Sequence, residues 1–232
     1  MQCPKKCGVN RTQKQKGFCQ ETDDLKIAFA GLHFGEEPLV TVFGGSGTIF
    51  ITGCTLRCAF CQNYQISQNG YGSDVDSKEF TKMCLDLQNA GAENINIVTG
   101  SHHIPKLAEF IRSAKDAGVS IPFCWNSSAY ETVESLELLK DLVTIWLPDL
   151  KTLSSSLSKD LFLAPDYPQV AAKAIKWMIQ NNPLKIQTVQ SPKNAKSIEW
   201  AQDGEPREKM QQGVIIRHLF LPGKFEETAE VL

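Results

Sequence analysis

The chain has 232 residues, of which 42% are hydrophobic and 22% charged, and its formal net charge is -2. A chain of this size buries one substantial core without room for a second full domain, and its charge balance gives no electrostatic footprint for nucleic acid. It has no apolar run long enough to span a bilayer and no hydrophobic signal segment, so we expect a cytoplasmic protein that binds neither nucleic acid nor membrane.

The first 40 residues are predicted to form an N-terminal extension ahead of a core domain over residues 41–232. Three of the eight cysteines lie in this extension, Cys3, Cys7 and Cys19, at C-x3-C-x11-C spacing. Cysteines in the cytoplasm serve as metal ligands and core residues more often than as disulfides. A closed metal site needs a fourth ligand, so a second cluster, a zinc ion and unligated thiols all remain open for these three.

A second group of three cysteines follows a short apolar strand predicted over residues 48–51, which a glycine-rich segment introduces. Cys54, Cys58 and Cys61 have C-x3-C-x2-C spacing. A structural zinc site has four protein ligands, whereas three thiolates around a cubic iron-sulfur cluster leave one iron open for a substrate or cofactor. The pattern therefore favours a catalytic cluster over core cysteines, disulfide partners or a zinc knuckle.

Short apolar strands alternate with amphipathic helices along the rest of the chain. The further strands are expected at residues 94–98, 121–125, 144–147 and 214–219. The helices are expected from a cap at Ser77 to Gly91, from Pro105 to Gly118, near residues 131–140, and from Pro168 to about Gln180. Cys84 and Cys124 fall on apolar faces of these elements, so both are expected in the core.

This alternation predicts an α/β fold in which about five to six parallel strands form a partial (β/α) barrel. Residues 191–212 are polar and aperiodic, and we interpret them as a surface insertion before the fifth strand. The sequence ends on what resembles the start of another helix. A helix with no strand after it would leave a sheet edge exposed, so we expect a barrel that is truncated at its C-terminus.

The cysteine loop resembles that of the radical S-adenosylmethionine (radical SAM) superfamily, whose motif is C-x3-C-x-aromatic-C, with Phe60 at the aromatic position. Further segments resemble one branch of it, the pyruvate formate-lyase activating-enzyme-like iron-sulfur proteins. These segments are residues 3–11 with 17–19, 45–54, 94–99, 147–151, 164–168 and 216–223. Most of these matches are weak alone, but together and in this order the set is specific.

The resemblance implies a 4Fe-4S cluster held by Cys54, Cys58 and Cys61, which reduces S-adenosylmethionine to methionine and a 5'-deoxyadenosyl radical that abstracts hydrogen. An electron donor such as flavodoxin or ferredoxin is an implied partner, with a protein substrate as a second one. In the nearest relatives the hydrogen comes from a glycine of a glycyl radical enzyme. A radical enzyme acting on another peptide, protein or small molecule, and a non-catalytic iron-sulfur or metal-binding protein, are the alternatives.

The resemblance also implies the residues that bind the cofactor. They are Phe60 in the loop, Asn126 and Ser127 after the third strand, Asp149 and Lys151 after the fourth, and Arg217 in the fifth. Arg217 or Lys151 can pair with the methionyl carboxylate, while Asp149 and Asn126 can accept from ribose hydroxyls or the amino group. A surface turn is the alternative for Asp149 and Lys151, because Pro148 marks a turn.

One segment departs from the pattern of the activating enzymes. Where they carry Gly-Gly-Glu after the second strand to hold the cofactor's amino group, residues 99–103 read Thr-Gly-Ser-His-His. The acidic residue is missing, and Ser101 or His102 is the available substitute. A polar loop without ligand contacts is the alternative for the two histidines.

Overall fold

The computed structural model of the chain describes residues 3–190 and 205–232, and its central feature is one mixed β-sheet. The strands follow the order β3-β1-β2-β4-β5-β6-β8-β7. Their bounds are β1 Lys26–His33, β2 Ser46–Ile51, β3 Ser73–Asp74, β4 Ile95–Val98, β5 Phe123–Ser127, β6 Ile145–Pro148, β7 Lys185–Val189 and β8 Arg207–Val214. Among the described residues, β2, β4, β5, β6 and β8 pair in parallel. The predicted α/β fold, a partial barrel of about five to six parallel strands, is confirmed, and the described residues form five of them.

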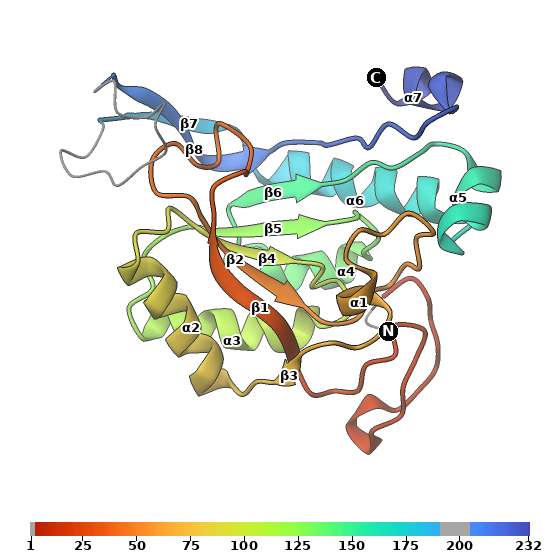
Figure 1. The fold of residues 1–232 in the computed structure, drawn as a ribbon, viewed down its shortest axis with the longest axis horizontal. Helices are drawn as coiled ribbons and strands as arrows, with labels where there is room; N and C mark the ends of the chain where they lie inside the picture. The colour runs from red at the N-terminus through yellow and green to blue at the C-terminus, as the bar shows by residue number, and fades with distance from the viewer. Residues whose placement is uncertain (1–2, 191–204) are drawn as a thin grey trace.

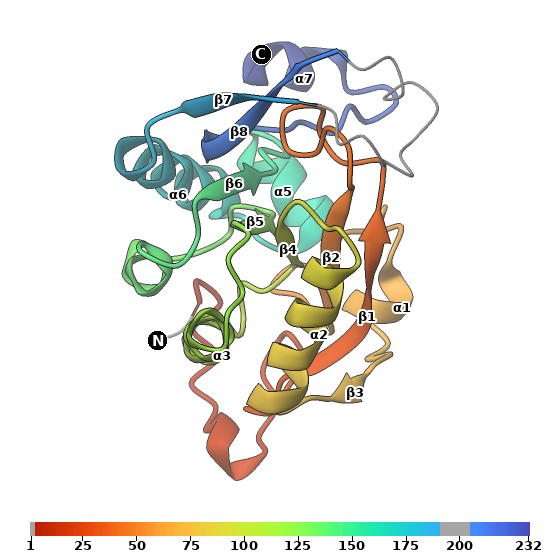
Figure 2. The same ribbon diagram turned by 90° about the vertical axis from the view of Figure 1, so that its left-hand side faces the viewer.

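The described part of the chain also contains seven α-helices. They are α1 Tyr64–Ser67, α2 Ser77–Asn89, α3 Ile104–Asp116, α4 Val133–Leu136, α5 Ser155–Phe162, α6 Tyr167–Asn181 and α7 Phe225–Val231. The helices α2, α3 and α6 pack on one face of the sheet, as Figures 1 and 2 show, and their apolar side chains join those of the central strands in the main core. No helix in the described ranges has the length and apolar character needed to cross a bilayer.

Two of the predicted helices differ from the structure in detail. The cap of α2 is Asp76 rather than Ser77. Its carboxylate accepts hydrogen bonds from the backbone N–H groups of Lys78 and Glu79, and the Glu79 carboxylate accepts one from the Asp76 N–H, which completes a capping box. The helix expected near residues 131–140 is the short α4 followed by a 3-10 turn over Glu137–Leu139. The helices α1 and α5 were not predicted. Cys84 and Cys124 are fully buried, as expected.

The strand predictions need correction at both edges of the sheet. The fifth parallel strand is β8, which begins at Arg207 instead of Val214, so residues 207–212 of the predicted insertion belong to the sheet. Residues 191–204 of that insertion lie outside the described residues. Beyond β8 the chain stays extended as far as Arg217, whose backbone bonds to β6 and to Leu150.

The outer edge of β8 is covered by this chain itself. Antiparallel pairing joins β7 to β8, so the edge expected to be exposed beside the fifth strand is occupied. At the opposite edge β1 pairs antiparallel with β2 and with β3. Since β1 lies within residues 1–40, the range predicted as the N-terminal extension contributes a strand to the core sheet.

Candidate functional site

A cavity of about 500 Å³ opens at the carboxyl ends of the parallel strands, on the side of the molecule where α1 lies (Figure 1). All nine residues predicted to bind the cluster or cofactor line it: Cys54, Cys58, Phe60, Cys61, Asn126, Ser127, Asp149, Lys151 and Arg217. They come from four segments: the loop after β2, the last two residues of β5, and the chain following β6 and β8. Parallel strands bring these segments to one edge because their carboxyl ends all point the same way.

The cysteine loop is fixed by tight packing at both of its ends. Gly53 has φ +84° at the start of the loop, and a Cβ there would lie 2.9 Å from the carbonyl oxygen of Cys19. Leu56 is fully buried, and the ring of Phe60 meets Phe162 of α5 edge to face at 6.2 Å. Phe60 therefore lines the cavity and also anchors the loop to the helical layer.

Two thiols of the loop, those of Cys54 and Cys58, have raised pKa values because they are buried. Burial raises the pKa of Cys54 to about 12 and that of Cys58 to about 11, and the ammonium of Lys151 lowers both in part. The Leu56 backbone N–H lies 3.3 Å from Cys54 Sγ and donates to it. Without a bound metal the thiols of Cys54 and Cys58 stay protonated at neutral pH. A metal cluster binds thiolates, so its binding would release these protons.

Three thiols that line one cavity form a donor set that fits an iron-sulfur cluster. A cubic cluster binds each thiolate through a different iron, so it accepts three cysteines that line the wall of one cavity without meeting at one point. Cys54, Cys58 and Cys61 fit this arrangement.

The polar half of the cavity is organised around Arg217. Its guanidinium donates to Asp149 Oδ1 from Nε at 3.0 Å, with Nη2 2.8 Å from the same oxygen, and Nη2 also donates to Asn126 Oδ1 at 2.6 Å. Nη1 lies 3.4 Å from the Glu36 carboxylate. The partners of Arg217 are thus cavity residues from three other segments of the chain.

Lys151 is the second cation of the cavity. Its side chain is 13% exposed, and its ammonium lies 3.0 Å from Asp149 Oδ2. Burial lowers its pKa, but Asp149 and the thiols of Cys58 and Cys54 together raise it above the ordinary value. Tyr167 of α6 fixes the turn, since its hydroxyl donates to the Asp149 carbonyl at 2.6 Å and accepts from the Lys151 N–H at 2.9 Å. Asp149 and Lys151 therefore belong to the wall of the cavity, and the surface-turn alternative does not describe them.

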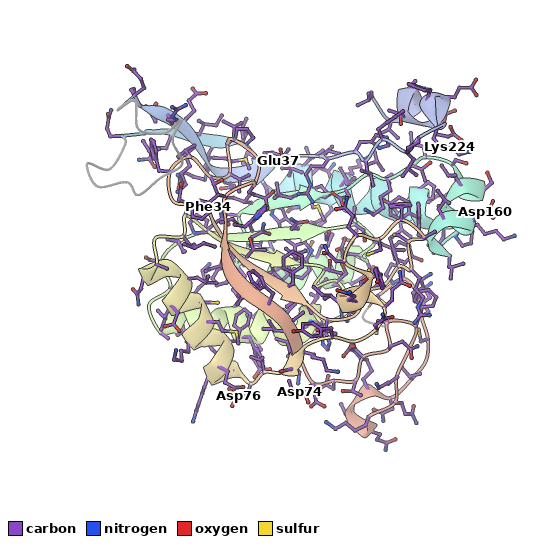
Figure 3. All side chains as sticks on the ribbon, viewed as in Figure 1. Phe34, Glu37, Asp74, Asp76, Asp160 and Lys224 are labelled. Carbon is purple, nitrogen blue, oxygen red and sulfur yellow. The ribbon has the colours of Figure 1, made fainter. Side chains whose placement is uncertain are left out.

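Sequence reasoning missed the acidic residues that line the cavity from the other end of the sheet. Glu36 and Glu37 lie in the connection between β1 and β2, where Figure 3 labels Glu37 with its neighbour Phe34. The side chain of Glu36 is 8% exposed. Because β1 is antiparallel to β2, this connection enters at the amino end of β2, away from the edge where the other residues meet. Only recognition of β1 as a strand could have pointed to it.

The segment that departs from the activating-enzyme pattern divides between two surroundings. Thr99, with φ +64°, lines the cavity, but Ser101, His102 and His103 are buried and none of them is among the lining residues. Ser101 donates to Glu131 at 2.5 Å, and His102 Nε2 lies 2.7 Å from the Thr52 carbonyl oxygen. Burial lowers the pKa of His102 to about 4. Ser101 and His102 do not line this cavity, so the structure does not support either of them as a substitute for the missing acid.

Comparison with known proteins assigns the chain to a family. A family model described as the radical SAM superfamily matches residues 48–190, which contain the cysteine loop. An uncharacterized protein of Methanocaldococcus jannaschii is 31% identical over 235 aligned residues, which cover 98% of this chain and 58% of the relative. The chain thus spans little more than half the length of this curated relative.

A comparison with solved structures matches two of SuiB from Streptococcus suis. SuiB bound to the precursor peptide SuiA matches with a TM-score of 0.48 and 14% identity, covering 77% of this chain and 33% of that one. SuiB bound to S-adenosylmethionine matches with a TM-score of 0.39 and 15% identity, covering 55% of this chain and 36% of that one.

Proposed function

Because the chain belongs to the radical SAM superfamily, we propose that its cavity binds a 4Fe-4S cluster together with S-adenosylmethionine and that the protein cleaves this cofactor reductively. One observation carries the proposal: three thiols and the polar network around Arg217 line the same cavity of about 500 Å³. That volume lies within the range of roughly 300–1,000 Å³ that small-molecule sites usually have.

Cys54, Cys58 and Cys61 hold the cluster in this proposal, and Lys151 provides a positive charge near two of the thiols. The chemistry that the cluster supplies when bound is the one-electron reduction of the cofactor's sulfonium. The protein's own contribution is to orient the cofactor and to exclude competing reactions. A buried cation beside thiolates favours their charged form, which stabilises the ligand set.

Arg217 and Lys151 are the proposed partners of the cofactor's methionyl carboxylate. Both are cations on the cavity wall, and guanidinium groups bind carboxylates through paired hydrogen bonds. Asn126 and Asp149 remain the proposed acceptors for the ribose hydroxyls or the amino group. Arg217 is already oriented by Asp149 and Asn126, so little conformational entropy is lost when a carboxylate binds.

The finer proposal concerns the substrate. Several segments resemble pyruvate formate-lyase activating-enzyme-like proteins in the same order along the chain. This resemblance supports hydrogen abstraction from a glycine of a partner protein, with flavodoxin or ferredoxin as electron donor. Residues 3–19 and 216–223 carry part of this resemblance at the two ends of the chain. The curated relative is uncharacterized, so the identity of the partner stays a proposal.

Product analysis tests the coarser proposal. The full chain, reconstituted anaerobically, reduced with dithionite and mixed with S-adenosylmethionine, is expected to release 5'-deoxyadenosine, detected by mass spectrometry. Cys58→Ala is expected to abolish release, whereas Cys84→Ala, which removes a core cysteine of α2 far from the motif in sequence, preserves it. Release that is equal in wild type and Cys58→Ala, or absent from wild type with a full cluster, would refute it.

The finer proposal needs a second readout. Addition of a glycyl radical enzyme to the same reaction is expected to produce the doublet signal of a glycyl radical in electron paramagnetic resonance (EPR) spectra. Release of 5'-deoxyadenosine with no protein radical on any added candidate would leave cofactor cleavage intact and reject glycyl radical activation.

A further inference from the structure

A second cavity of about 440 Å³ lies within the N-terminal segment, apart from the one that holds the motif cysteines. It is lined by the three cysteines of that segment, Cys3, Cys7 and Cys19, and by His102, which follows β4. Folding thus brings together thiols separated by up to 16 positions and an imidazole more than 80 positions away. Three thiols and one imidazole form the donor set of a Cys3His zinc site.

As at the motif cysteine Cys54, a backbone N–H is directed at each of the three sulfurs. The Phe18 backbone N–H lies 3.3 Å from Cys7 Sγ and donates to it. Burial raises the pKa of the Cys3 thiol, and a backbone hydrogen bond from Lys5 lowers it in part. Cys19 shows the same two opposing effects, with Glu21 as the backbone donor. Backbone N–H groups directed at sulfur stabilise thiolates, which are the metal-binding form.

His102 presents a ring nitrogen suited to a metal. Its side chain is 1% exposed, and Nε2 makes its hydrogen bond to the Thr52 carbonyl at 2.7 Å. A carbonyl only accepts, so Nε2 carries the proton and Nδ1 presents a lone pair. Among the described residues Nδ1 has no hydrogen-bond partner. A histidine that donates one N–H to a backbone carbonyl while the other nitrogen binds metal is a common arrangement at zinc sites.

We propose that Cys3, Cys7, Cys19 and Nδ1 of His102 bind a zinc ion in a closed tetrahedral site. The four side chains are not grouped tightly enough to hold an ion as they stand, so binding requires the cysteine side chains to rotate within the cavity that they already line, while the bond to Thr52 keeps His102 in place. Zinc is favoured over a second cluster because the set supplies four protein ligands, of which one is an imidazole. On binding, the thiols release their protons.

The site would fasten the N-terminal segment to the loop of the motif cysteines. The Cys19 carbonyl packs against Gly53, and the ring of Phe18 lies near two cations, Lys5 Nζ at 4.0 Å from its centroid and the Arg57 guanidinium at 5.8 Å. Gly53 directly precedes the motif cysteine Cys54, and Arg57 directly precedes the motif cysteine Cys58. Zinc at the second cavity is therefore expected to order the segment beneath the loop without entering the reaction.

Zinc content tests this proposal without using activity. The full chain carrying Cys54→Ala, Cys58→Ala and Cys61→Ala, which cannot assemble the cluster, is expected to retain about one zinc atom per chain by elemental mass spectrometry. Cys19→Ala and His102→Ala in that background are expected to weaken zinc affinity by at least about tenfold. Cys84→Ala is the matched control and is expected to leave the affinity unchanged.

Cobalt provides a second measurement on wild-type protein, in case the substituted chains fail to fold. Co²⁺ loaded into the site is expected to give sulfur-to-cobalt charge-transfer absorption whose intensity corresponds to about three thiolates and the visible bands of tetrahedral coordination. An unchanged zinc affinity in either Cys19→Ala or His102→Ala would overturn the four-ligand site. Wild-type protein that holds about eight iron atoms and no zinc would also overturn it, in favour of a second cluster.

Discussion

Arg217 is the side chain on which the polar half of the cavity depends. Its guanidinium contacts Asp149, Asn126 and Glu36, which come from three other segments of the chain. Such a hub holds several side chains in one geometry, because guanidinium donors lie in a fixed plane. A lysine at the same position keeps the charge but presents a single point of contact.

Arg217→Lys is therefore expected to weaken binding of S-adenosylmethionine by roughly tenfold or more, since losing one or two hydrogen bonds removes on the order of 1–3 kcal/mol. Equilibrium dialysis against the reconstituted protein measures the change. Arg112→Lys, on the exposed face of α3, is the matched control and is expected to leave affinity unaltered. Equal affinity in wild type and Arg217→Lys would remove Arg217 from the cofactor site.

Glu131 gives a residue-scale prediction on pH. Burial raises its pKa above the ordinary value of 4.5, while hydrogen bonds from Ser101 and Trp125 lower it in part. An acid whose pKa is raised by folding binds its proton more tightly in the folded state, so stability falls as pH rises from the unfolded pKa through the folded one. The neutral Glu131→Gln keeps an acceptor oxygen without this effect.

Urea unfolding at about pH 4.5 and about pH 8 tests it: relative to Glu131→Gln, wild type is expected to lose stability as pH rises. A difference in unfolding free energy between the two proteins that is independent of pH would show that Glu131 titrates alike in the folded and unfolded states.

At the scale of elements, the loop after β2 depends on one backbone position. Gly53 has φ +84° and approaches the Cys19 carbonyl, so both the left-handed conformation and the lack of a side chain are needed there. Gly70 offers a comparison in the same region of backbone space, because it has φ +73° and nothing within 4 Å of where a Cβ would lie. The two positions separate conformational strain from close packing.

Gly70→Ala is expected to cost about 1 kcal/mol of folding free energy, the typical penalty for a left-handed alanine. Gly53→Ala is expected to cost about 2 kcal/mol more, since the added methyl meets backbone that cannot easily move, and to lower the iron content after reconstitution. Chemical denaturation and iron analysis measure both effects. Equal costs at the two positions would mean that the packing of Cys19 against Gly53 adds nothing.

The central strands could be predicted from sequence and the edge strands could not. Strands β4 and β6 are short apolar runs whose residues are almost all buried, which is the pattern of a parallel strand between two layers. Strand β7 is nearly all exposed and β8 is largely polar, so neither has a continuous apolar run. The edge strand β7 and its neighbour β8, which are incompletely buried, therefore lack the apolar signal on which the prediction rested.

At the scale of the whole molecule, the positions of the site residues were predictable where they follow a predicted strand. Asn126 and Asp149 lie within two residues of the ends of predicted strands, the motif cysteines lie in the loop after one, and parallel strands end at one edge. The positions of Glu36 in the main cavity and of His102 in the second cavity could not be predicted, because they depend on contacts between segments far apart in sequence. Glu36 meets a residue 181 positions away, and His102 lines a cavity with the N-terminal cysteines.

The central claim is that one cavity holds the cluster and S-adenosylmethionine side by side. The most direct measurement is the EPR spectrum of the reduced, reconstituted protein with and without S-adenosylmethionine, in samples carrying about four iron atoms per chain. Binding of the cofactor beside the cluster predicts a changed spectrum in wild type and a smaller change in Arg217→Lys at the same cofactor concentration. Identical spectra with and without S-adenosylmethionine in wild type would contradict the account.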